Sequence, residues 1–181
     1  MIAHRIRIPG LVVAAFALLA VGTAANGQQG TAGSARPSDQ VTFYGSPTAA
    51  ISAGVVIPPN RSWIWTSGTT PAVAKADAPA GSRERYGDTR AQATSILKNL
   101  AGQLQAQGLT LKDVVYLRAY LVPDPTKGNK IDMEGWTAAY SESFGTPANP
   151  TKPARSTVGV AALVNADWLI EIEAFAVRPP S

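Results

Sequence analysis

The clearest hydrophobic pattern in the chain is an alternation near its carboxyl end, where residues 169–177 predict a β-strand. The side chains alternate between a small apolar set, Ile170, Ile172, Ala174 and Ala176, and a mixed set, Leu169, Glu171, Glu173, Phe175 and Val177. The apolar set predicts a face packed under helices. Two carboxylates set among large apolar groups indicate that the mixed face is also covered, and covered carboxylates need a cation or hydrogen-bond donors. Arg155, at the start of the preceding strand pattern, is the cation nearest in sequence, so we expect it on this face.

Three short strand patterns come first in the folded part of the chain. They cover residues 41–44, 53–57 and 63–67, and their spacing predicts an antiparallel meander. A loop rich in Ala, Pro and Gly, residues 68–87, follows them. A loop of this length is typical either of a functional lid or of a simple insertion, and the pattern does not separate the two.

Two helices are predicted in the middle of the chain. Asp88 or Thr89 caps the first, which runs to about Gln107 and stops at Gly108. Its apolar residues form one stripe, and we expect its polar residues, Gln92 among them, on the opposite side. The second helix covers residues 133–144, with four side chains turned inward: Trp136, Ala139, Tyr140 and Phe144.

Residues 114–121 predict a strand between these helices. Its faces are predicted to hold Val115, Leu117, Ala119 and Leu121 toward the helices, and Val114, Tyr116, Arg118 and Tyr120 away from them. A polar loop, residues 123–132, follows this strand. The element order is β-β-β-α-β-α-β-β, which predicts an α+β fold with two helices packed on one face of a mostly antiparallel sheet.

The first 25 residues have the pattern of a secretory signal peptide. A basic start with His4, Arg5 and Arg7 precedes an apolar run over residues 11–21, and small residues follow at 22–25. The apolar run is too short for a stable membrane anchor. Residues 26–40 read as a flexible linker and residues 41–181 as one domain, so we expect a periplasmic or secreted protein.

The residue types that the chain lacks exclude several kinds of catalytic and metal-binding site. The chain has no Cys, and its one His, His4, leaves with the signal peptide. This excludes Ser-His-Asp and Cys-His catalysis and the usual zinc and copper sites. Any acid–base catalysis must then use Glu, Asp, Lys, Tyr or a bound water. No phosphate-binding Gly loop is present, and we expect neither a metal nor a cofactor. Without Arg5 and Arg7 the net charge falls from +4 to +2, and no basic run interleaved with aromatic residues predicts nucleic-acid binding.

Four segments together resemble the RidA/YjgF family of reactive imine and enamine deaminases. They are TSG at residues 66–68, the helix with QATSILKNLAGQLQAQGLTLKDVV, PARSTV at residues 153–158, and IEIEAFAV at residues 170–177. The resemblance implies a chorismate-mutase-like fold and a homotrimer with a barrel-like core. It also implies active sites in clefts between adjacent subunits.

The same resemblance assigns roles to residues of this chain. Arg155 would bind the substrate carboxylate and Glu171 would hold and activate the attacking water, with Ser67, Gly68 and the backbone near Thr157 lining the pocket. The alternative for Arg155 is an intersubunit salt bridge. Glu173 is expected to be a structural partner of Arg118 or Arg155. Two family residues differ here: the tyrosine of a GPY segment has no clear match, and an Asn of the second helix falls at Thr137.

Two functions from different classes remain open at the level of sequence. The first is hydrolytic deamination of small 2-iminocarboxylates to 2-oxo acids and ammonia. The second is non-catalytic binding of small carboxylate metabolites by a trimer. A third activity attached to the family, ribonuclease, is disfavoured by the missing His and the weak positive charge.

Overall fold

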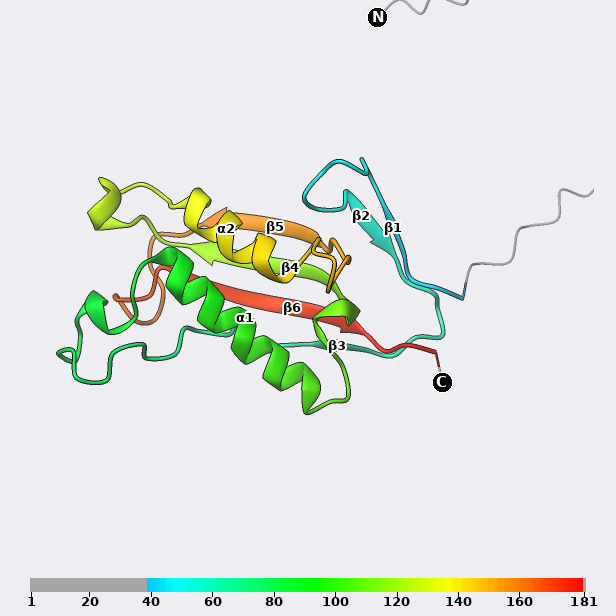
Figure 1. Cartoon of the computed structure of the whole chain (residues 1–181), viewed down its shortest axis with the longest axis horizontal. Coiled ribbons are helices and arrows are strands. Elements are labelled where there is room, and N and C mark those ends of the chain that lie inside the picture. The colour runs from blue at the N-terminus through cyan, green and yellow to red at the C-terminus, as the bar shows by residue number, and fades with distance from the viewer. Residues whose placement is uncertain (1–38, 181) are drawn as a thin grey trace, which may run out of the picture. The chain divides into compact units, whose positions relative to one another are not determined.

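The central sheet places the last strand of the chain between two strands that precede it in sequence. The computed structural model describes residues 39–180, so the expected signal peptide (residues 1–25) and most of the linker (residues 26–40) lie outside the described residues. The sheet has the order β3-β6-β4-β5, with β3 (Trp63–Trp65), β6 (Ile170–Val177), β4 (Val114–Leu121) and β5 (Ala154–Gly159) (Figure 1). Strand β6 is antiparallel to both of its neighbours, whereas β4 and β5 run parallel.

The expected meander of the first three strands is wrong at its third strand. Strands β1 (Thr42–Tyr44) and β2 (Gly54–Val56) pair with each other in a separate two-stranded sheet. Strand β3 instead pairs with the free edge of β6, where Ile64 lies opposite Ala176. Pro58 and Pro59 lie between β2 and β3 and have no N–H to donate, which separates the two strands.

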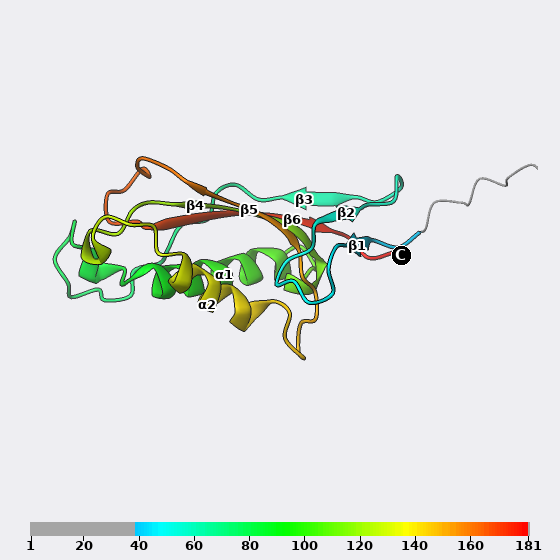
Figure 2. The same ribbon diagram turned by 90° about the horizontal axis from the view of Figure 1, so that it is seen from above.

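Both helices cover the same face of the four-stranded sheet, as Figure 2 shows for α1 (Thr89–Gln105) and α2 (Met133–Ser143). The predicted α+β fold is therefore confirmed. Asp88 caps α1 by accepting a hydrogen bond from the backbone N–H of Ala91 at 2.8 Å. The helix ends two residues earlier than expected, and Gly108 follows it with a φ of 72°. Among residues 39–180, no helix is long and apolar enough to cross a membrane.

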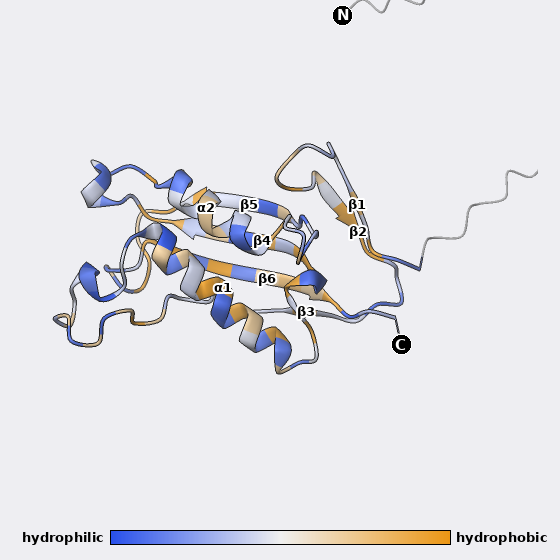
Figure 3. Ribbon diagram, in the orientation of Figure 1, coloured by the Kyte–Doolittle hydropathy of each residue, from blue (hydrophilic) through white to orange (hydrophobic). Residues whose placement is uncertain are grey.

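The hydrophobic core lies between the helices and this face of the sheet. The small apolar set of β6, Ile170, Ile172, Ala174 and Ala176, is fully buried there, as the alternation predicts. The inward side chains of α2 are buried as well: Trp136, Ala139, Tyr140 and Phe144. Figure 3 shows α1 with apolar and polar bands alternating along its length, which is the expected appearance of a helix with one apolar stripe.

A β-bulge reverses two predicted side-chain directions at the start of β4. The register against β6 shifts between Val114 and Tyr116, so that Val114 lies opposite Ala176 and belongs to the core. Val115 contributes instead to pockets lined by Val177 on the other side. One extra residue in a strand exchanges the faces of the residues before it. Simple alternation does not include this extra residue, and it therefore predicts the opposite directions for Val114 and Val115. From Tyr116 onward the predicted faces are confirmed.

The 68–87 segment is held in place by its own polar contacts. It contains a short 3-10 helix, η1 (Arg83–Arg85), and the Arg85 guanidinium donates hydrogen bonds to the carbonyls of Ala76 (3.0 Å) and Ala78 (2.9 Å). Two further 3-10 turns, η2 (Leu111–Asp113) and η3 (Pro125–Lys127), lie before and after β4. The segment is therefore an ordered part of the fold.

Candidate functional site

Glu171 lies on the sheet face that the helices leave open. Its register partner on β4 is Tyr120, and both side chains are half-buried. The segment that follows β3 covers it: a Cβ atom on Gly68 would overlap the Glu171 carboxylate. Gly68 therefore permits a close approach of backbone and carboxylate that any other residue would obstruct. Ser67, the residue before it, is exposed.

The backbone of this segment is fixed to β6 on both sides of Gly68. Thr69 exchanges two hydrogen bonds with Ile172, at 2.8 and 3.1 Å. Thr66 donates its N–H to the carbonyl of Ala174 (3.0 Å) and accepts from the Ala174 N–H through its hydroxyl (3.0 Å). Glu171 and Gly68 thus share one rigid frame.

Burial raises the pKa of the Glu171 carboxyl above its ordinary value, and the nearby negative charge of Glu173 raises it further. A glutamate with a raised pKa is a stronger base than an exposed one. Such a shift is typical of a carboxylate that takes up a proton during a reaction.

Glu173 has different surroundings, although it lies only two residues away on the same face. Its carboxylate lies 3.5 Å from Nη1 of Arg118 and accepts a hydrogen bond from the Tyr120 hydroxyl at 3.2 Å. The expectation that Glu173 is a partner of Arg118 is therefore confirmed. These contacts occupy Glu173, whereas no cation forms an ion pair with Glu171 within residues 39–180.

Arg155 is not on the face of Glu171, and that expectation is wrong. In the parallel pairing of β4 and β5, Arg155 lies beside Leu117, a core residue on the helix-covered face. Its guanidinium carbon lies 4.5 Å from the ring centroid of Tyr140 and 5.2 Å from that of Trp136, both on α2. Alternation along one strand predicts which residues share a face, but not how the faces of two strands correspond, because that depends on register.

The surroundings of Arg155 are aromatic and contain no anion. Within residues 39–180 its Nη1 is buried without a hydrogen-bond partner, and no carboxylate forms an ion pair with it. Burial lowers the pKa of this guanidinium from its ordinary value. A half-buried cation without an anion is costly, and only the two rings compensate it in part.

The other predicted residue of β5, Thr157, lies on the same face as Arg155. Its hydroxyl accepts a hydrogen bond from the Trp136 indole N–H at 3.2 Å. Tyr140 is fixed in turn by a hydrogen bond from its hydroxyl to the carbonyl of Ala50, at 3.2 Å. The predicted site residues therefore form two groups on opposite faces of the sheet: Glu171 with Gly68 and Ser67, and Arg155 with Thr157.

Gln92 is a residue whose surroundings the sequence pattern misrepresents. Helical spacing predicts it on the polar side of α1, but it is fully buried and makes three hydrogen bonds. Helical periodicity assigns polar residues to solvent, and it carries no information about a buried amide. Among residues 39–180 no three His, Cys, Asp or Glu side chains form a group that could hold a metal ion.

Comparison with known proteins gives consistent matches in sequence and in structure. A family model described as endoribonuclease L-PSP matches residues 46–178. A 2-iminobutanoate/2-iminopropanoate deaminase of Salmonella typhimurium is 39% identical over 117 residues, which cover 65% of this chain and 80% of that protein. The RutC family protein PH0854 of Pyrococcus horikoshii is 37% identical over 94 residues, which cover 51% of this chain and 64% of that protein.

Two solved structures match most of the chain. YyfB of Yersinia pestis, described as a protein of unknown function of the conserved Rid protein family, is 26% identical with a TM-score of 0.57, covering 76% of this chain and 98% of its own. Escherichia coli TdcF, solved with bound serine, is 27% identical with a TM-score of 0.50, covering 72% and 96%.

Proposed function

The chain belongs to the RidA/YjgF family, and we propose that it hydrolyses small 2-iminocarboxylates to 2-oxo acids and ammonia. The observation that carries this proposal is the state of Arg155, a half-buried guanidinium held between two aromatic rings with no anion from its own chain. A substrate carboxylate would supply the missing charge. A guanidinium binds a carboxylate through two parallel hydrogen bonds, which also orients the substrate.

Glu171 supplies the base in this proposal. It accepts a proton from a water molecule as the water oxygen attacks the imine carbon, which produces a tetrahedral carbinolamine. Glu171 returns that proton to the imine nitrogen, so that the carbinolamine is neutral. It then takes the hydroxyl proton and passes it to the same nitrogen, the C–N bond breaks, and ammonia leaves as the carbonyl of the 2-oxo acid forms. One water is consumed for each ammonia released. Positioned acid–base catalysis of this kind contributes about 10²–10⁴-fold, which is a useful acceleration for a bond that hydrolyses readily.

A complete site needs two copies of the chain. Arg155 and Glu171 lie on opposite faces of one sheet, so a substrate of a few carbon atoms does not reach both within a single chain. We propose that Arg155 of one copy and Glu171 of a neighbour meet in a cleft of a homotrimer. The open face is suited to contact with a neighbour, because exposed aromatic side chains lie on it: Trp63 is 56% and Trp65 53% exposed.

Binding without turnover is the alternative function. TdcF, a relative solved with bound serine, holds a small molecule that carries a carboxylate, and Arg155 alone would be sufficient for such binding. From the signal-peptide pattern we also propose that the protein acts in the periplasm or outside the cell.

Ammonia release separates the two functions. The imine is generated in the assay by a separate enzyme, and the rate of ammonia release is compared for the wild type, Arg155→Lys, Arg155→Ala and Glu171→Gln. For a deaminase we expect loss of turnover in all three variants and retention of 2-oxo acid binding, measured by calorimetry, in Glu171→Gln alone. Lys keeps the charge but lacks the planar fork that matches a carboxylate. Carboxylate binding without acceleration by the wild type would favour the binding function.

A further inference from the structure

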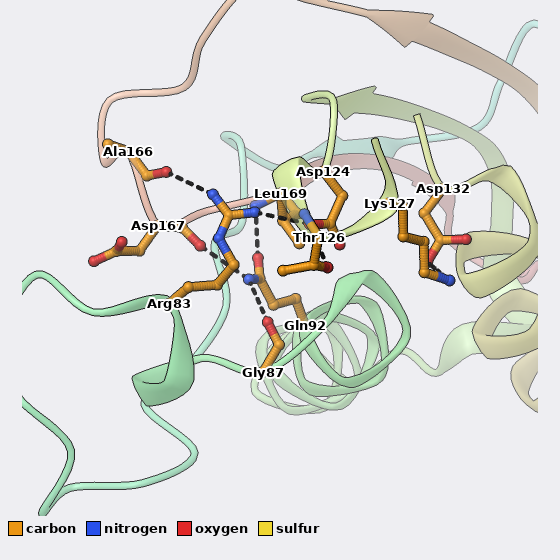
Figure 4. Close-up of polar contacts among 10 residues, drawn as sticks. All are labelled: Arg83, Gly87, Gln92, Asp124, Thr126, Lys127, Asp132, Ala166, Asp167 and Leu169. Atoms are coloured by element: carbon orange, nitrogen blue, oxygen red, sulfur yellow. Dashed lines mark hydrogen bonds and ion pairs between the residues drawn. The ribbon is translucent and has the colours of Figure 1, made fainter. Parts of the chain in front are cut away.

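The side chain of Gln92 connects the start of β6 to the end of the 68–87 segment. Its amide nitrogen donates to the carbonyls of Gly87 (3.1 Å) and Asp167 (3.0 Å), and its amide oxygen accepts from the N–H of Leu169 at 2.7 Å. Figure 4 shows these contacts, with Gln92 extending from α1 toward the chain just before β6. The residue is 0% exposed, so water does not replace any of the three hydrogen bonds.

Only a primary amide of this length satisfies all three backbone groups. Two of them are carbonyls that need donors and one is an N–H that needs an acceptor, which matches the two N–H groups and the oxygen of glutamine. Glutamate has no donor at neutral pH, methionine has neither function, and asparagine is one methylene shorter. A replacement therefore leaves buried backbone groups unpaired.

Glu171 lies between Leu169 and Ile172, and the backbone N–H and carbonyl of both residues form hydrogen bonds with segments other than β6. Leu169 is bound at its N–H by Gln92 and at its carbonyl by the N–H of Val122 (2.9 Å). Ile172 is bound at both groups by Thr69. The Gln92 contact is the one of these that a side chain provides, so it can be removed by mutation without breaking the chain's backbone pairing.

From this arrangement we propose that Gln92 is a positioning residue for Glu171. The inference rests on the proposed function, because it assigns Gln92 a part in the same reaction. Gln92 fixes the backbone two residues before Glu171, just before β6 begins. There the Leu169 N–H donates to the side-chain oxygen of Gln92. Displacement of a catalytic group by about 1 Å costs roughly 100-fold in rate, so a small shift of this backbone would be measurable.

The test compares Gln92→Met with two controls on the same helix. Gln105→Met makes the same exchange at an exposed position, and Leu104→Ala removes a core side chain at the other end of α1 from Gln92. Gln92→Asn provides a milder variant that keeps both amide functions, for use if Gln92→Met does not fold. Each protein is assayed for kcat of imine hydrolysis, for 2-oxobutanoate binding, and for amide hydrogen exchange at Ile172.

For Gln92→Met we expect kcat to fall roughly 10–100-fold, the magnitude of a misplaced catalytic group. Its 2-oxobutanoate Kd should change less than about twofold, since carboxylate binding is assigned to Arg155, whose rings Trp136 and Tyr140 share no hydrogen bond with Gln92 or with the backbone groups that Gln92 holds. Amide exchange at Ile172 should be faster in Gln92→Met than in Leu104→Ala. The Leu104→Ala control should lose stability but keep the wild-type kcat. A wild-type kcat in Gln92→Met, or exchange at Ile172 no faster than in Leu104→Ala, would overturn the inference.

Failure of the proposed function gives a different result. In that case the wild type itself releases no ammonia above the uncatalysed rate, and the kcat comparison does not apply. The exchange measurement then still decides whether Gln92 holds the backbone beside Glu171.

Discussion

At the scale of single residues, the two carboxylates of β6 show how surroundings divide roles between identical side chains. Glu173 is occupied by Arg118 and the Tyr120 hydroxyl, which stabilise its charge. Glu171 has a backbone segment over it, and its pKa is raised by burial and by Glu173. One carboxylate is therefore held in structural contacts, while the raised pKa of the other favours uptake of a proton.

The raised pKa of Glu171 predicts the acid side of the pH–rate profile. Because the base must be ionised, kcat/KM for imine hydrolysis should fall as the pH drops through this pKa, which lies above the ordinary value for glutamate. Glu173→Gln removes a negative charge and should move this acid limb to lower pH. The rate is measured as ammonia release between pH 4 and 8 (roughly the range around a shifted carboxyl), corrected for uncatalysed hydrolysis. An unchanged acid limb in Glu173→Gln would show that the carboxyl titrating there is not Glu171.

Gly68 provides a second prediction at the same scale. Gly68→Ala places a methyl group where the Glu171 carboxylate lies, so the carboxylate must move and turnover should fall roughly 100-fold. Folding should be preserved, because the obstructing atoms belong to the flexible end of a side chain. Gly102→Ala, where a Cβ meets nothing within 4 Å, is the matched control and should stabilise α1 by about 0.5–1 kcal/mol. Equal activity of the two variants would remove Gly68 from the site.

At the scale of elements, hydrophobic periodicity was sufficient for the two helices and for the core face of β6. It was not sufficient for Arg155, whose face is set by the parallel register of β5 against β4, a long-range pairing that no local pattern contains. Periodicity misplaces Gln92 for a related reason, since its burial depends on the backbone of Asp167 and Leu169, which lie 75 and 77 residues away in the sequence. The candidate residues were thus identifiable from sequence, while their division between two faces was not.

The two long loops are joined by a buried ion pair, which was also invisible in the sequence. Nη1 of Arg83 in the 68–87 segment lies 3.2 Å from Oδ1 of Asp124, whose side chain is 1% exposed (Figure 4). The same Oδ1 accepts from the N–H and the hydroxyl of Thr126, both at 2.8 Å, while Oδ2 is buried without a hydrogen-bond partner. Arg83 is therefore the cation on which this buried carboxylate depends.

Removal of that cation should destabilise the fold measurably. Arg83→Gln leaves the Asp124 charge buried, and we expect a loss of about 1–3 kcal/mol in the free energy of unfolding, measured by urea denaturation. Lys75→Gln breaks the exposed Lys75–Glu84 pair of the same segment and should have no measurable effect. In Arg83→Gln combined with Asp124→Asn, part of the loss should be recovered. Equal stability of the Arg83 and Lys75 variants would contradict the assigned role of the buried pair.

At the scale of the whole molecule, the open sheet face presents a group of aromatic side chains beside Glu171. Phe175 stacks between the rings of Trp63 and Trp65, with centroids at 6.0 and 4.4 Å, and Tyr116 meets it edge-on at 5.7 Å. These aromatic residues lie on the same face as Glu171, so a neighbour that covers them also approaches the carboxylate. An Arg155 brought by that neighbour would convert two incomplete halves into one site.

Mixing two inactive variants tests this arrangement directly. If each site takes Arg155 from one copy and Glu171 from another, Arg155→Ala and Glu171→Gln should be inactive separately but partly active after they are unfolded and refolded together. With random assembly from equal amounts, half of the Arg155 positions and half of the Glu171 positions are intact, so about a quarter of the wild-type turnover should return. As a control, the double variant Arg155→Ala/Glu171→Gln is refolded with an equal amount of wild type. This mixture dilutes intact Arg155 and Glu171 to the same extent, but its active sites are formed by wild-type chains and not by two inactive variants. Recovery of no activity in the mixture, from variants that are inactive separately but refold and assemble, would mean that both residues act within one chain. Activity of either variant by itself would mean that the replaced residue has no part in the reaction.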